Sequence, residues 1–213
     1  MSKSLIALLL APLGLIPGQE LKPVALPTPQ TSGGKPLMQV FKERKSVRDF
    51  GPEQLSRQTL SNLLWAAWGI NREDGRRTAP SASNRQEIDV YVVMADGAYL
   101  YDAKANALKP VAQTDMRKLA GTQAYVADAP VNLVYIADTA KLGGDDAARL
   151  ATANADAGFI AQNVYLFCAS EGLGTVVRGS VNRVDLGKAM NLRAEQRIIL
   201  AQSVGYASKS ARN

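Results

Sequence analysis

The sequence predicts a single α+β domain in which a central sheet is flanked by helices. Two observations lead to this prediction. The 213 residues include 46% hydrophobic and 21% charged side chains, ordinary proportions for a chain long enough to bury one core. Apolar runs of strand length also alternate with segments of helical period, without an internal repeat. We place this domain at residues 37–213.

The first 36 residues lack this pattern. Lys3 precedes an apolar run at residues 5–16, which is shorter than the roughly 20 residues of a membrane span. We therefore expect residues 1–19 to be a signal peptide and the protein to be exported, in a bacterium to the periplasm. An apolar arm packed on the fold is the alternative. Residues 20–36 contain four prolines and the Gly33-Gly34 pair, and predict an extended arm or linker.

Helices and strands follow in order along the domain. Residues 37–41 predict a short amphipathic helix, and Ser56 caps a second helix that stops at Gly69. Residues 88–93, 131–138 and 197–206 predict strands because they are nearly continuously apolar, and 98–102 with 107–111 predict a hairpin. The clearest helix spans residues 147–170. Its small residues, Ala151 to Ala161, indicate either a tightly packed core helix or a helix–helix interface.

Two absences restrict the chemistry. The chain has no histidine and a single cysteine, Cys168, which we expect to be a buried structural thiol. Histidine-based catalytic triads, His/Cys zinc sites and intramolecular disulfides are therefore excluded. A bound cofactor is the simplest source of chemistry for an enzyme of this composition. The net charge of +6 favours anionic partners, but nucleic-acid binding lacks support because no basic stripe carries stacking aromatics.

Three segments have the composition of a binding site. Arg44, Lys45, Ser46 and Arg48 form a cationic segment that suits a phosphate, although a solvated surface would look the same. Pro80, Ser81, Ala82, Ser83 and Asn84 lead into a strand and can expose main-chain groups to a flat ligand; a plain loop is the alternative. In the glycine-rich stretch 170–181, Gly172 ends a helix, Gly174 permits a tight turn, and Gly179 lets the backbone approach a ligand.

Taken together and in this order, the segments resemble the nitroreductase superfamily of FMN-dependent oxidoreductases over about residues 37–206. The resemblance rests on R-x-S-x-R-x-F at 44–50, P-S-x-x-N-x-Q at 80–86, A-Q-N at 161–163, G-L-G at 172–174 and a final G-Y at 205–206. It implies a mixed or antiparallel sheet and an intertwined homodimer with FMN at the subunit interface. The usual proline after G-Y is Ala207 here, which leaves the path of the tail open.

The resemblance also implies a role for each segment. Arg44, Lys45, Ser46 and Arg48 would hold the phosphate and ribityl end of FMN, with Lys209 and Arg212 available to close that site. Pro80 to Asn84 would lie along the flavin ring and its pyrimidine edge. Val177, Arg178 and Gly179 would approach the reactive nitrogen of the ring through a backbone N–H, and Gln123 is a weaker candidate for a hydrogen bond. No catalytic side chain and no metal ligand are expected.

The implied reaction is ping-pong transfer of electrons through FMN, from NAD(P)H or another donor to a small electrophile such as a nitroaromatic or a quinone. Partial resemblance to the thiazoline/oxazoline-dehydrogenase branch leaves a second possibility. In that case the protein would be an exported flavin-binding protein, or a dehydrogenase of the same fold, that does not use NAD(P)H. A structural or adhesive domain is a third possibility, in which residues 44–48 would be surface charge.

Overall fold

A seven-stranded sheet organises the protein, and the computed structural model describes residues 22–209 of it. The strands lie in the order β1-β4-β3-β2-β5-β7-β6, and every neighbouring pair is antiparallel. Of the two sheet types implied above, the antiparallel one is therefore confirmed. The strands are β1 (Val24–Ala25), β2 (Ile88–Met94), β3 (Gly97–Asp102), β4 (Ala107–Ala112), β5 (Val131–Asp138), β6 (Gly174–Arg178) and β7 (Gln196–Gly205).

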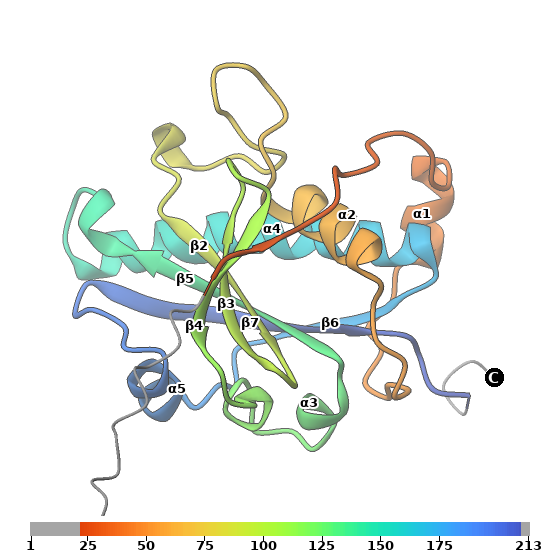
Figure 1. Cartoon of the computed structure of the whole chain (residues 1–213). Helices are drawn as coiled ribbons and strands as arrows, with labels where there is room; N and C mark the ends of the chain where they lie inside the picture. The colour runs from red at the N-terminus through yellow and green to blue at the C-terminus, as the bar shows by residue number, and fades with distance from the viewer. Residues whose placement is uncertain (1–21, 210–213) are drawn as a thin grey trace, which may run out of the picture.

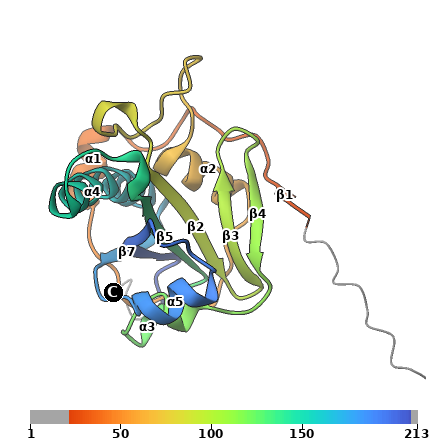
Figure 2. The same cartoon turned by 90° about the vertical axis from the view of Figure 1, so that its left-hand side faces the viewer.

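Helices cover both faces of the sheet (Figures 1 and 2). α1 (Leu37–Glu43), α2 (Arg57–Trp68) and α4 (Asp146–Glu171) lie on one face, and α3 (Tyr125–Asp128) and α5 (Arg183–Ala189) lie on the other. β5 contributes to both cores because its side chains alternate. Leu133 and Tyr135 pack toward α2 and α4, whereas Val134 and Ile136 pack toward the α5 side.

Local sequence signals position the two long helices. The Ser56 hydroxyl accepts a hydrogen bond from Thr59 N at 3.0 Å and caps α2, as predicted. α4 begins after Asp145, whose carboxylate accepts from Ala148 N at 2.8 Å, and ends at Gly172 with a φ of 71°. The predicted boundaries of α4 are within one residue of those observed. Its small residues serve in part as core, because Ala153, Ala157 and Ala161 are buried while Ala151 and Ala155 are exposed.

The stretch 170–181 differs from the prediction. Gly172 does end the helix, but Gly174 is not a turn residue: it begins strand β6. A Cβ at Gly174 would lie 2.8 Å from Cγ1 of Val47, so the glycine permits close packing rather than a turn. The structure also adds α5, which the sequence pattern did not reveal.

The arm at residues 22–36 is docked on the domain. β1 pairs with β4 at the edge of the sheet, and the Ser61 hydroxyl donates to Pro27 O at 2.5 Å. The predicted signal peptide lies outside the described residues. Within residues 22–209, no helix has the length and apolar character needed to cross a membrane.

Candidate functional site

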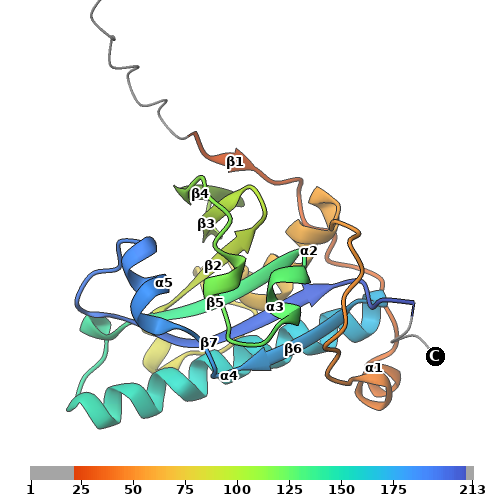
Figure 3. The same cartoon turned by 90° about the horizontal axis from the view of Figure 1, so that it is seen from below.

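The predicted phosphate segment, residues 44–50, runs beside the free edge of β6 (Figure 3). Val47 N donates to Thr175 O at 2.9 Å, which attaches the segment to the strand. Phe50 forms a bridge with Ala207, and Ser208 N donates to Asp49 O at 3.1 Å. The main chain therefore fixes the segment between β6 and the C-terminal tail, and Lys209, which follows Ser208, lies at the same end of the molecule.

Tyr165 of α4 connects this segment to β6. Its hydroxyl lies 2.8 Å from the Ser46 hydroxyl and accepts a hydrogen bond from Val177 N at 3.0 Å. The guanidinium of Arg44 lies 5.2 Å from the centroid of the same ring, within the range of a cation–π contact. The sequence analysis missed Tyr165, although its position four residues after Ala161 places both on one helix face.

In the part of the chain that the structure describes, the cations of this segment are not ion-paired with carboxylates. No ion pair within residues 22–209 involves Arg44, Lys45 or Arg48. Lys45 lines a cavity of about 390 Å³ together with Val47, Tyr165 and Thr175, and the same cavity is lined by Lys35 and Glu43, which form an ion pair with each other at 2.6 Å. This concentration of positive charge suits an anion such as a phosphate. Arg212, the other candidate for this site, lies outside the described residues.

The side chain of Arg178 has a structural role. It is buried and donates to Ser203 Oγ at 2.8 Å, Ala120 O at 2.8 Å and Asn132 Oδ1 at 2.9 Å. Burial lowers the pKa of this guanidinium to about 10. The side chain is thus committed to the interior. Val177 N already donates to Tyr165, so the exposed Gly179 is the residue of this stretch best placed to offer a ligand its main chain.

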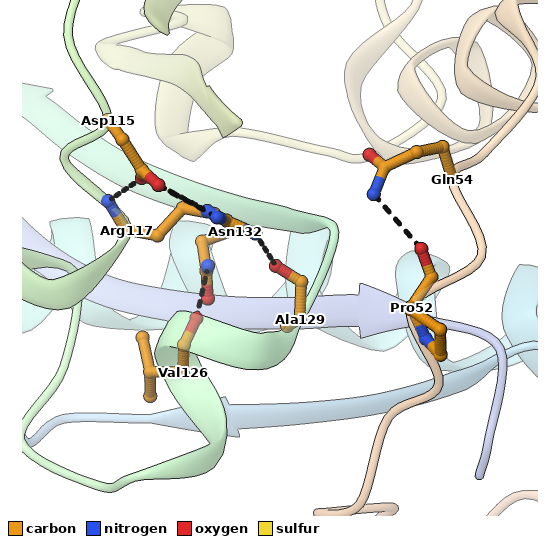
Figure 4. A network of polar contacts seen from close by, with 7 residues as sticks. All are labelled: Pro52, Gln54, Asp115, Arg117, Val126, Ala129 and Asn132. Atoms are coloured by element: carbon orange, nitrogen blue, oxygen red, sulfur yellow. Dashed lines mark hydrogen bonds and ion pairs between the residues drawn. The ribbon is translucent and has the colours of Figure 1, made fainter. Parts of the chain in front are cut away.

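Gln123 lies in the segment between β4 and β5, close to the end of β6. Thr122 N donates to Ser180 O at 3.3 Å, and Figure 4 shows how the segment is held. There Asn132 donates to Val126 O at 2.9 Å, and Arg117 contacts both Asp115 and Ala129 O. The Gln123 Oε1 atom is buried and has no hydrogen-bond partner among the described residues. A buried acceptor of this kind suits a donor on a ligand.

The predicted ring segment, residues 80–84, is held against the N-terminal half of α4. Ser83 and Asn84 have φ values of 52° and 53°, a conformation that side chains other than glycine seldom adopt. Gln86 N donates to Ser81 Oγ at 3.0 Å, and Ala82 N donates to Asp156 Oδ2 at 2.8 Å. The strained loop is therefore fixed before any ligand binds.

Asp156 and Glu87 form a buried carboxyl pair beneath this loop. Both carboxyl oxygens of Glu87 are buried without a hydrogen-bond partner among the described residues. Burial, and then the neighbouring Asp156 carboxyl, raise the pKa of Glu87 to about 7. The sequence analysis missed this pair. The helical spacing of α4 could have indicated Asp156, because it lies on the same helix face as the apolar Ala153 and Ile160 and therefore faces the core.

The two predicted halves of the site do not meet within one chain. Residues 44–48 contact α4 at Tyr165, whereas residues 80–84 contact it at Asp156, nine positions earlier. Nine residues correspond to roughly 14 Å along a helix and to about 180° around it. The two segments also lie apart in Figures 1 and 2, and the cavity that Lys45 lines includes none of residues 80–84.

Comparisons with known proteins identify the family. The sequence pattern of the nitroreductase family matches residues 41–206. A Methanocaldococcus jannaschii protein, provisionally described as a nitroreductase, is 32% identical over 157 residues, which cover 68% of this chain and 78% of that protein.

Solved structures agree. A Ralstonia eutropha protein, also provisionally described as a nitroreductase, superposes with a TM-score of 0.83 at 41% identity over 88% of this chain and 90% of its own. The E. coli microcin synthetase McbBCD complex shares the fold, with a TM-score of 0.70 at 24% identity over 78% of this chain and 70% of that one. The chain therefore belongs to the nitroreductase family of oxidoreductase enzymes.

Proposed function

We propose that this protein is an FMN-dependent oxidoreductase with a ping-pong reaction. Electrons would pass from NAD(P)H or another donor to a small electrophile such as a nitroaromatic or a quinone. Flavin binding is typical of the family. The observation that carries the proposal is the cationic segment of Arg44, Lys45 and Arg48, which lacks carboxylate partners among the described residues and is attached to the free edge of β6.

The residues of this chain fit the two ends of FMN. Arg44, Lys45, Ser46 and Arg48 would hold the phosphate and ribityl end, with Lys209 beside them. The unpartnered Gln123 Oε1 and the main chain of the exposed Gly179 are the polar groups suited to the ring, because Val177 N already donates to the Tyr165 hydroxyl. Because Tyr165 holds both Ser46 and Val177 N, it would set the spacing between the two ends.

FMN held by these residues would supply the two-electron chemistry that links the donor to the acceptor. The protein's own contribution is then to bind and orient the reactants. The main chain at Gly179 would place a dipole near the reacting atoms, and the fixed loop at residues 80–84 would provide a flat surface. This division of labour requires no histidine, in agreement with the composition.

We also propose that the active unit is a homodimer. Within one chain, residues 80–84 lie on the opposite side of α4 from residues 44–48. A second copy could contribute its own residues 80–84 to the cationic segment of the first. Proteins of this fold are typically dimers, which agrees with this arrangement.

The test of FMN binding uses paired arginine substitutions. The protein is mixed with FMN and desalted, and its visible spectrum is recorded. We expect the wild type to retain about one FMN per chain and Arg44→Ala with Arg48→Ala to bind at least about 100-fold more weakly, because two charge-assisted contacts are lost. Arg57→Ala, in the first turn of α2, is the matched control. A folded wild-type protein that retains no flavin would refute the proposal.

A further inference from the structure

A second basic site lies beside the predicted ring segment. Residues 70–78 form a short hairpin, the gold loop at the top of Figure 1, in which Ile70 pairs with Arg77 and Thr78 N donates to Gly69 O at 2.9 Å. We call residues 71–77 the arginine loop. Its three arginines, Arg72, Arg76 and Arg77, line a cavity of about 540 Å³. The rest of the lining is Ala79 and four residues of the predicted ring segment: Pro80, Ser81, Ser83 and Asn84.

The cavity has an excess of positive charge. No acidic side chain is among its lining residues, and only Arg76 has an ion-pair partner within residues 22–209, the exposed Asp74 at 2.5 Å. Arg72 donates to Asn71 Oδ1 at 3.1 Å and to Arg77 O at 3.2 Å, and both acceptors are neutral. Such an arrangement leaves guanidinium charge available for an oxyanion.

Arg77 is the fixed member of the group. It donates to Gln86 Oε1 at 2.7 Å and to Trp68 O at 2.8 Å, and its guanidinium lies 4.8 Å from the centroid of a Trp68 ring. Burial lowers the pKa of Arg77, and the nearby Tyr101 hydroxyl and the carboxylates of Asp89 and Asp102 offset this only in part. A partly buried cation with neutral hydrogen-bond acceptors gains more from an arriving anion than a solvated one does.

Gln86 joins the two walls of the cavity. Its amide nitrogen donates to Gly75 O in the arginine loop at 3.1 Å and to Asn84 Oδ1 in the ring segment at 3.0 Å. The arginines are therefore held in a fixed relation to residues 80–84. A ligand bound by the arginines would lie directly against that segment.

We propose that this cavity binds the oxyanion of the enzyme's substrate, so that the preferred substrates are small planar molecules carrying a carboxylate or a phosphate. The proposal rests on the proposed function, which places the flavin ring along residues 80–84. Arg72 and Arg76 determine the specificity for charge, and Arg77 positions the site through Trp68 and Gln86.

The test is a ligand-observed NMR titration of the FMN-loaded protein with benzoate, phenyl phosphate and neutral benzamide. We expect one or both anions to bind at least about tenfold more tightly than benzamide, since one charge-assisted contact contributes that much. Whichever of the two anions binds more tightly shows whether the cavity prefers a carboxylate or a phosphate. Arg72→Gln with Arg76→Gln should abolish the preference, and Arg85→Gln, an exposed neighbour outside the cavity lining, should leave it within about twofold.

Equal binding of benzamide and both anions, or an unchanged preference in the double variant, would overturn the proposal. A shift of the flavin spectrum in the double variant, without loss of anion binding, would also overturn it by assigning the arginines to the cofactor. Titration of the flavin-free protein separates failure of the oxyanion site from failure of the proposed FMN binding. Anion preference that persists in a chain unable to retain FMN would support the oxyanion site while refuting the flavin assignment.

Discussion

The most unusual residue of the interior is Glu87, which immediately precedes β2. Its carboxyl group is buried against Asp156. The charge of Lys141 lowers the pKa of Glu87 only in part, and the Lys141 ammonium donates its hydrogen bond to Gln86 O at 3.1 Å. Two carboxyl groups in one buried site cannot both ionise cheaply, so one proton is retained. Asp156 also accepts a hydrogen bond from Ala82 N, so the carboxyl pair that retains this proton is in direct contact with the predicted ring segment.

Glu87→Gln should therefore change how stability depends on pH. The pKa of Glu87 is about 7 in the folded protein and 4.5 ordinarily, so its contribution is full below pH 4.5 and is lost as pH rises through 7. At about 1.4 kcal/mol per pKa unit, the loss is of the order of 3 kcal/mol. The uncharged glutamine should remove this loss, making the variant more stable than the wild type at pH 8 but not at pH 5.

Urea denaturation at the two pH values measures the effect. Glu53→Gln, at an exposed position, is the matched control and should follow the wild type. If the Glu87→Gln profile also follows the wild type, the buried carboxyl is not the group that titrates.

Among the elements, the contact between the cationic segment and β6 decides the position of the predicted phosphate site. The segment has no regular structure of its own. Along β6 it is held by one main-chain hydrogen bond to Thr175 and by Val47 packing against Gly174, in addition to its contacts with Tyr165 and the C-terminal tail. The missing side chain at Gly174 is what allows the two backbones to lie this close.

Gly174→Ala should accordingly destabilise the protein by about 1–3 kcal/mol, because the new Cβ would lie 2.8 Å from Val47 Cγ1 and Val47 is stiff. Val47→Ala in the same chain should recover part of this loss, and a double-mutant cycle in chemical denaturation measures the coupling. Gly187→Ala is the control: its Cβ would meet only Leu192 at 3.8 Å, and the substitution should not lower the free energy of unfolding. Additive effects of the Gly174 and Val47 substitutions would show that the contact does not hold the segment.

The same elements show what the sequence could and could not predict. α4 is long and strongly periodic, and Ser56 and Gly172 have clear capping signals, so these elements were predicted to within a residue or two. β6 was missed because its five residues follow a glycine-rich turn that dominates the local pattern. The separation of residues 44–48 from residues 80–84 depends on which side of α4 each one contacts, and no local pattern encodes that tertiary choice.

At the scale of the whole molecule, one surface has the character of an interface. α1 packs beside the C-terminal half of α4 (Figure 3), and large apolar side chains are exposed on both helices: Leu37, Met38 and Phe41 on α1, and Phe159 on α4. The small residues Ala151, Ala155 and Gly158 of α4 are also exposed, which permits close approach of a second helix. An apolar surface of this kind typically marks a contact with another protein chain.

We therefore expect the wild type to sediment as a dimer and Phe159→Glu to weaken association at least about tenfold, because a charge would enter the centre of the interface. Val184→Glu is the matched control: Val184 is 64% exposed on α5, across the sheet from α4, and its substitution should leave the dimer intact. Analytical ultracentrifugation measures both variants. The Phe159→Glu monomer should also lose FMN, since residues 80–84 of a second chain would no longer reach the cationic segment. A stable, flavin-retaining monomer would instead require both halves of the site to come from one chain.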